Sequence, residues 1–171
     1  MTFITQFVRK MAGGSLASVW HRVAPSFTVK KKFYGATMHF DFRDNFDALL
    51  VSDVDLRKRE WPVMEIPEKI EGMVWDIGAN VGYLTVRAAT AGREVVAFEL
   101  STRAVELLEK TRSRNTFTFE IVSRAFLAEK VPYTPPTTAW SGNKVQVAEE
   151  GAAQSITFQE AEDQLGMPAL I

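Results

Sequence analysis

The sequence predicts an α/β fold with a parallel sheet, and three observations lead to this prediction. An apolar strand pattern at 74–77 runs into a glycine-rich turn and then into a helical pattern over 83–89. A second apolar strand at 93–99 closes on a carboxylate, Glu99. The acids at the two strand ends, Asp76 and Glu99, are 23 residues apart, the length that one strand–helix–strand unit needs.

The turn after the first strand has the residues that a sharp reversal requires. Gly78 can take left-handed dihedral angles, and Asn80 tolerates that region better than most residues. Gly82 lacks a side chain, as is needed where a ligand or a strand backbone comes close. The helix from about Tyr83 presents free N–H groups and a partial positive charge, which favour a carboxylate or a phosphate. Because Asp76 can accept hydrogen bonds from an ammonium group, the turn can hold both ends of an amino-acid zwitterion.

The second strand adds a site for a nucleoside. An acid that ends this strand, as Glu99 does, can hydrogen-bond ribose hydroxyls. The same geometry fits a nicotinamide dinucleotide, so the glycine spacing decides between the ligands. A dinucleotide site uses Gly-x-Gly-x-x-Gly, whereas this chain has Gly78-x-Asn80-x-Gly82, with Tyr83 at the place of the third glycine. The spacing disfavours a dinucleotide-dependent oxidoreductase.

Two segments resemble the first two cofactor motifs of class I S-adenosylmethionine-dependent methyltransferases. They are DIGANVGY, which begins at Asp76, and VAFE, which ends at Glu99. The sequence GANVG is similar to the corresponding motif of the FkbM family. The resemblance extends from about Lys69 to the end of the chain. One departure is Leu100, where that family usually carries proline.

This resemblance implies a Rossmann-like fold, S-adenosylmethionine as the cofactor, and O-methylation of a hydroxyl on a sugar or another small metabolite. It implies that Asp76 and Gly78 line the methionine part of the cofactor and that Glu99 holds the ribose. The cofactor-binding residues that it implies are Asp76, Gly78, Ala79, Asn80, Gly82, Tyr83 and Glu99. No metal site is expected, because neither His21 nor His39 has a visible partner ligand.

A structural explanation of both motifs stays open. Any parallel α/β domain needs glycine at a tight strand-to-helix turn, and a strand can end in an acid without binding anything. The chain can therefore be a non-catalytic remnant that binds a nucleoside, or one that binds a partner at an open sheet edge. The occurrence of both motifs at the right separation favours the nucleoside site.

Composition indicates one globular protein. A chain of 171 residues with 46% hydrophobic residues can bury roughly 70% of its unfolded surface. The net charge of −1 gives no electrostatic reason to expect a nucleic-acid partner. The absence of cysteine excludes disulfides and thiolate metal sites. Since no apolar run reaches the ~18 residues of a membrane span, a cytoplasmic protein without an integral membrane segment is expected.

The residues before the cofactor motifs are predicted to form a separate region over 1–68, followed by a partial cofactor domain over 69–171. Apolar residues between Phe3 and Val23 recur at near-helical spacing. They predict an amphipathic helix that is interrupted at Gly13-Gly14. Its apolar stripe is expected to pack on the protein's own domain, and the alternative is that it lies on a membrane surface.

The rest of this first region has β and proline signals. Two β-rich runs flank Tyr34-Gly35 and predict a hairpin over 27–42. The segment 44–71 contains prolines that interrupt a short helical pattern, so it is expected to cover the sheet edge as broken helices.

The chain beyond Glu99 continues the α/β pattern. Ser101 is a favourable N-cap for a helix that runs through Arg112, and 116–126 predicts a third strand. Prolines then open an irregular stretch. Short β signals at 145–147 and 155–158 predict an antiparallel insertion.

The last residues, 157–171, resemble the helix and the strand start that precede the FkbM motif Lys-Ile-Asp-x-Glu-Gly. The chain stops at Ile171, before that motif, so we expect a C-terminally truncated chain with the first half of the parallel sheet. The residues that orient or deprotonate the hydroxyl acceptor are expected to lie outside it. No catalytic residue is therefore predicted.

Overall fold

A computed structural model describes residues 22–45, 65–139, 145–148 and 153–171. The helix predicted between Phe3 and Val23 lies almost entirely outside the described residues, and so does most of the segment 44–71. The predictions made for these two segments therefore stay predictions.

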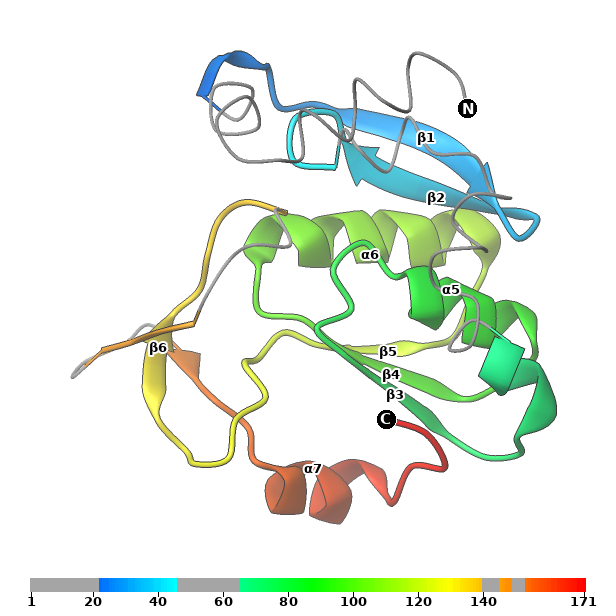
Figure 1. The fold of residues 1–171 in the computed structure, drawn as a ribbon, viewed down its shortest axis with the longest axis vertical. Helices are drawn as coiled ribbons and strands as arrows, with labels where there is room; N and C mark the ends of the chain where they lie inside the picture. Colours follow the sequence, from blue (N-terminus) through cyan, green and yellow to red (C-terminus); the bar gives the residue numbers. More distant parts are fainter. Residues whose placement is uncertain (1–21, 46–64, 140–144, 149–152) are drawn as a thin grey trace, which may run out of the picture.

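The central sheet is parallel and has the strand order β3-β4-β5 (Figure 1). Its strands are β3 (Val74–Ile77), β4 (Val95–Phe98) and β5 (Glu120–Val122). Helix α5 (Tyr83–Thr90) connects the first pair and α6 (Thr102–Asn115) the second. This alternation confirms the predicted α/β fold with a parallel sheet.

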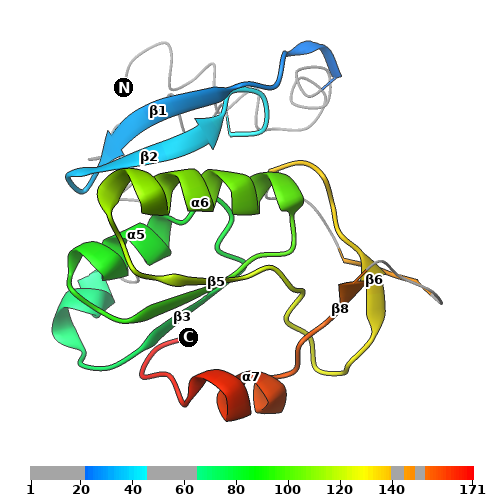
Figure 2. The same ribbon diagram turned by 180° about the vertical axis from the view of Figure 1, so that it is seen from behind.

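Helices cover both faces of the sheet. Helices α5 and α6 lie on one face, and α7 (Phe158–Leu165) lies on the other (Figures 1 and 2). On the α7 side, Trp75 and Phe98 form a buried cluster with Ile156 and Ala161. The aromatic rings of Trp75 and Phe98 meet edge to face at 5.3 Å, which is a favourable packing geometry.

After α7 the chain returns to the free edge of β3. Leu170 forms a parallel bridge with Val74, and its carbonyl accepts the N–H of Trp75 at 2.8 Å. The predicted start of a fourth strand is thereby confirmed. Because β4 lies on one side of β3 and this segment on the other, the strand order reverses at β3. Ligands of open α/β sheets bind at such a point, beyond the carboxyl ends of the strands.

The predicted third strand at 116–126 is too long. Thr116 takes the left-handed conformation that ends α6, and β5 occupies only three residues. Beyond β5, the N–H of Arg124 donates to the carbonyl of Val122 at 2.9 Å, and this local turn ends the strand. Phe126 then makes an isolated bridge to Ile156. The strand ends early because its partner β4 ends at the same level.

The predicted antiparallel insertion is confirmed, with different boundaries. Its strands are β6 (Pro132–Thr134), β7 (Gln146–Val147) and β8 (Ala153–Gln154), in the order β7-β6-β8. The strand expected at 155–158 is wrong in position. β8 precedes it, and Phe158 already begins α7, whose capping box is formed by Thr157 and Glu160.

The predicted hairpin consists of β1 (Thr28–Phe33) and β2 (Ala36–Asp41). Tyr34 and Gly35 both have positive φ, 46° and 81°, as a two-residue hairpin turn requires. The hairpin lies over α6 and α5, on the side away from the sheet (Figure 2).

Helix α6 also covers the outer edge of β2. The hydroxyl oxygen of Thr111 accepts the N–H of His39 at 2.9 Å. The side chain of Asn115 bonds both backbone groups of Thr37, at 2.8 and 2.9 Å. These bonds satisfy an edge that would otherwise expose unpaired peptide groups.

A buried carboxylate anchors the hairpin to the helix layer. Asp41 is 0% exposed and accepts hydrogen bonds from the hydroxyl of Ser26 at 2.6 Å and from Nε of Arg103 at 2.9 Å. Its other oxygen accepts two backbone N–H groups of the following turn. Burial raises the pKa of Asp41, but these hydrogen bonds together lower it more, so the pKa lies below its ordinary value.

Asp41→Asn is expected to lower the free energy of unfolding at pH 7 by about 1–3 kcal/mol, because a charge-assisted network loses its acceptor. A depressed carboxyl pKa stabilises the fold above the unfolded pKa of about 3.9, and this stabilisation is lost as the pH falls through the folded pKa. Urea unfolding at pH 7, 5 and 3 should therefore show the difference between the two proteins shrinking below pH 4. The exposed Asp163→Asn is the control, and a difference independent of pH would contradict the assignment.

Candidate functional site

The turn that follows β3 and the acid that follows β4 meet at the carboxyl edge of the sheet. Ile77 pairs with Phe98, so Gly78 and Glu99 leave the sheet at the same level. The N–H groups of Gly78 and Ala79 both donate to the carbonyl of Phe98, at 2.9 and 3.0 Å. The turn is thus folded over the end of β4.

The turn has the left-handed residues that its sequence predicts. Gly78 has φ of 78° and Asn80 has φ of 49°. A Cβ at Gly78 would meet nothing within 4 Å, so glycine is required here for its dihedral angle alone.

The group that lies close to Gly82 is not the predicted ligand or strand backbone but a side chain of α6. It is the left-handed N-cap of α5, with φ of 87°, and a Cβ there would overlap the side chain of Leu108 on α6. Neither a strand backbone nor a ligand is needed to explain this glycine. The absence of a side chain lets the first turn of α5 pack against α6.

Asp76 accepts hydrogen bonds from the first turn of α5. The carboxylate is 8% exposed, and its Oδ2 accepts the N–H of Thr85 at 2.9 Å and its hydroxyl at 2.5 Å. Since Gly82 has no side chain to cap α5, Asp76 does so from a neighbouring strand. Burial raises the pKa of Asp76 and the nearby Glu99 adds to this, while the bonds from Thr85 oppose it; the pKa lies above its ordinary value.

The carboxylate of Glu99 accepts three backbone N–H groups, one from the turn after β3 and two from the residues directly after Glu99. It is 6% exposed, and its Oε2 accepts the N–H of Asn80 at 2.7 Å. Its Oε1 accepts the N–H groups of Leu100 at 2.8 Å and of Ser101 at 2.7 Å. A carboxylate has about four lone-pair directions, so one direction on Oε2 is left for a ligand hydroxyl. Ser101 is also the N-cap of α6, as predicted.

Ala79 and Tyr83 place their side chains in the core. Ala79 is buried in a cluster with Ala97 and Leu108. The ring of Tyr83 packs against two hairpin rings, Phe33 at 5.1 Å and Phe40 at 5.9 Å. These two residues therefore shape the turn by packing.

Sequence reasoning did not find Thr85, Leu100 and Ser101 as partners of the two acids. Thr85 had a detectable signal, because a threonine at the third position of a helix can donate both its N–H and its hydroxyl to an acid that ends the preceding strand. The N–H groups of Leu100 and Ser101 carry no residue-specific signal. Their role depends on the path of the chain after β4.

The residues present fit a nucleoside with an amino-acid tail. The side-chain oxygen of Asn80 is buried and has no hydrogen-bond donor among the described residues. It belongs to the residue whose N–H binds Glu99, so a ribose hydroxyl near Glu99 is a suitable donor. Ile77 is 39% exposed at the end of β3 and offers apolar surface there.

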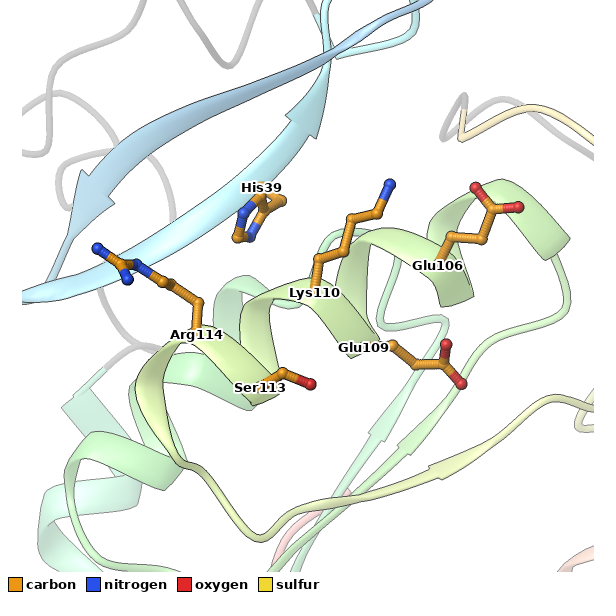
Figure 3. A pocket seen from close by; sticks show the side chains of 6 residues that line it. All are labelled: His39, Glu106, Glu109, Lys110, Ser113 and Arg114. Carbon is orange, nitrogen blue, oxygen red and sulfur yellow. The ribbon is translucent and has the colours of Figure 1, made fainter.

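Two surface hollows in the described part of the chain lie away from this turn. One, of about 460 Å³, lies between β2 and the outer face of α6 and includes His39, Lys110 and Arg114 (Figure 3). His39 is buried, and burial lowers the pKa of its imidazole. The positive charges of Lys30, Lys110 and Arg114 lower it further. The other hollow, of about 550 Å³, lies around Gly92, near the amino ends of β4 and β5. Neither includes a predicted cofactor residue.

Within the described ranges, no group of three or more His, Asp or Glu side chains is arranged to hold a metal ion. The helices of these ranges also include none that is long and apolar enough to cross a membrane.

No protein-family model matches this sequence, and no curated protein is significantly similar to it. Parts of solved structures are similar to part of the chain. One is the SAM-dependent methyltransferase from Agrobacterium tumefaciens, with 16% identity, coverage of 60% of this chain and 34% of that chain, and a TM-score of 0.46. Another is Trm5b from Pyrococcus abyssi, with 18% identity, coverage of 56% and 28%, and a TM-score of 0.42.

A third is the T. thermophilus 16S rRNA N2 G1207 methyltransferase RsmC in complex with AdoMet and guanosine. It has 27% identity, coverage of 57% of this chain and 27% of that chain, and a TM-score of 0.43. The chain thus matches about a third or less of the length of these proteins. Because all three TM-scores are below 0.5, the functional assignment rests on the chain's own residues.

Proposed function

We propose that this chain binds S-adenosylmethionine at the carboxyl ends of β3 and β4 and is the cofactor-binding part of a methyltransferase. The observation that carries the proposal is the hydrogen bond of 2.7 Å from the N–H of Asn80 to Glu99. It joins the turn after the first acid-bearing strand to the acid of the second. Two carboxylates on neighbouring strand ends, with a left-handed turn between them, suit a ligand that has an ammonium group and a ribose.

Each acid has a distinct role in this proposal. Asp76 receives the ammonium group of the methionine part, and Glu99 receives a ribose hydroxyl on its remaining lone pair. Gly78 brings the turn backbone near the ligand without a side chain. Asn80 offers its buried acceptor oxygen to the ribose.

The acceptor that we propose is a hydroxyl on a sugar or another small metabolite, because the sequence GANVG resembles the motif of the FkbM family. The bound cofactor supplies a methyl group on a positively charged sulfur. This methyl group would pass to the acceptor oxygen as its bond to sulfur breaks, and the hydroxyl proton would pass to a base or to water. Because the positive charge on sulfur disappears, a site that excludes water favours this transfer. We assign cofactor binding to Asp76, Gly78, Asn80 and Glu99, and we assign no residue to the acceptor hydroxyl.

Calorimetric titration with S-adenosylmethionine tests the proposal. The wild-type protein should bind it, and Asp76→Asn should bind at least tenfold more weakly because an amide attracts an ammonium group less than a carboxylate does. The variant keeps an acceptor oxygen for Thr85, so its melting temperature should be equal or higher. The matched control is the exposed Asp163→Asn on α7, which should change neither quantity.

Two outcomes would overturn the proposal. A well-folded wild-type protein that does not bind S-adenosylmethionine would leave both acids with structural roles only. Selective binding of NAD would indicate a dinucleotide site instead.

A further inference from the structure

Thr85 holds the carboxylate of Asp76 with two donors from one residue. Its N–H and its hydroxyl both bond Oδ2, at 2.9 and 2.5 Å. Thr85 is completely buried on α5, and Asp76 is nearly so at the end of β3. Rotation of the carboxylate would leave buried donors without an acceptor, which costs about 1–3 kcal/mol for each group. The carboxylate is therefore locked in one orientation.

The two oxygens of Asp76 are in different situations. Oδ2 already accepts both bonds from Thr85, whereas Oδ1 accepts no hydrogen bond from any residue that the structure describes. A ligand cation would therefore be received by Oδ1. The position of Oδ1 depends on Thr85, because Thr85 determines the rotation of the carboxylate.

We propose that Thr85 is a positioning residue that orients Asp76 so that its second oxygen recognises the ammonium group at the amino-acid end of the ligand. This inference rests on the proposed function, since it assumes a nucleoside that carries an amino-acid tail. It predicts that Thr85 affects recognition of the tail and leaves recognition of the nucleoside unchanged.

The hydroxyl of Thr85 also favours the charged form of Asp76. Burial disfavours that charge most, and the negative charge of Glu99, just after β4, disfavours it as well. On α5 the cation Arg87 pairs with Glu68 and lies over the ring of Tyr34. The hydrogen bonds from Thr85 are thus the interactions that oppose protonation of Asp76. Without the hydroxyl, Asp76 should take up a proton at a higher pH and lose its attraction for an ammonium group.

The experiment compares two ligands that differ only at the amino-acid end. S-adenosylhomocysteine carries the tail, and 5′-methylthioadenosine has the same nucleoside and thioether without it. Calorimetric titrations from pH 6 to 8.5 use the wild-type protein, Thr85→Val, which lacks the hydroxyl, and Thr85→Ser, which keeps it. Thr90→Val, near the end of the same helix, is the matched control.

The expected result is specific to the tail. Thr85→Val should bind S-adenosylhomocysteine about tenfold more weakly at pH 7, with a larger loss at pH 6, and 5′-methylthioadenosine within twofold of wild type. Thr85→Ser should restore most of the affinity, and Thr90→Val should behave as wild type.

Other results separate the failure of this inference from the failure of the proposed function. If Thr85→Val weakens both ligands equally, or neither, Thr85 has no positioning role. If the wild-type protein binds 5′-methylthioadenosine as tightly as S-adenosylhomocysteine, the nucleoside site stands and tail recognition by Asp76 is wrong. If the folded wild-type protein binds neither ligand, the proposed function itself fails. Should Thr85→Val not fold, Thr85→Ala, which also lacks the hydroxyl, takes its place in the same comparison of the two ligands over the same pH range, and equal affinities of Thr85→Ala and Thr85→Ser for S-adenosylhomocysteine would overturn the inference.

Discussion

Glu99→Ala is expected to lower the free energy of unfolding by about 3 kcal/mol or more, because its removal leaves three backbone N–H groups without their acceptor. The N–H groups of Asn80, Leu100 and Ser101 all bond this carboxylate at 2.7–2.8 Å. Each unsatisfied buried donor costs about 1–3 kcal/mol, and part of this cost is recovered where water reaches the loop. The same substitution should abolish measurable binding of S-adenosylmethionine, since the turn loses its connection to β4.

Urea unfolding at pH 7, together with titration of the ligand, checks this expectation. Glu99→Gln keeps one acceptor oxygen but turns an NH₂ group toward other donors, so its stability should lie between those of wild type and Glu99→Ala. The matched control is Glu94→Ala, an exposed glutamate before β4, which should stay within about 0.5 kcal/mol of wild type. Equal stability of Glu99→Ala and Glu94→Ala would contradict the structural role of this carboxylate.

Gly82→Ala is expected to lower the free energy of unfolding by about 2–5 kcal/mol, from two separate causes. A residue with a Cβ pays about 1–2 kcal/mol for the left-handed conformation that Gly82 adopts at φ of 87°. The added Cβ also overlaps the side chain of Leu108, and such overpacking typically costs about 1–3 kcal/mol. The helices α5 and α6 would have to move apart, or Leu108 would have to change rotamer.

A second glycine separates these causes. Gly92 has φ of 74°, and a Cβ there would meet nothing within 4 Å, so Gly92→Ala should show only the conformational cost. Urea unfolding gives the loss in free energy of unfolding for each variant. The difference between the two losses is the steric cost of the contact with Leu108. In the double variant Gly82→Ala/Leu108→Ala, the combined loss should be smaller than the sum of the single losses. Equal losses for Gly82→Ala and Gly92→Ala would show that the contact with Leu108 has no energetic consequence.

The sequence predicted those features that depend on neighbouring residues. The hairpin turn at Tyr34-Gly35 and the N-cap Ser101 follow from local dihedral and capping preferences, and both are present. Helix α5 and the strands beside it follow from hydrophobic periodicity. The parallel pairing of neighbouring strands β3 and β4 follows from the short strand–helix–strand connection between them.

Strand length and hairpin position could not be predicted in this way. The stretch 116–126 has β propensity throughout, yet only Glu120–Val122 forms a strand, because a strand extends only as far as its partner does. The hairpin packs on α6 because its free edge finds Thr111 and Asn115, which are more than 70 residues away in the sequence.

The candidate site also combines features that the local sequence predicts with features that depend on tertiary packing. The sequence by itself determined that Asp76 and Glu99 end neighbouring parallel strands and that a left-handed turn lies between them, since strand periodicity and glycine dihedral requirements are local properties. Only the tertiary structure decided that Thr85 holds one oxygen of Asp76, that Glu99 binds three backbone N–H groups, and that Gly82 faces Leu108. The physical reason is that a buried polar or apolar group must find its partner in space, and that partner is set by how the elements pack and not by the residues next to it in the chain.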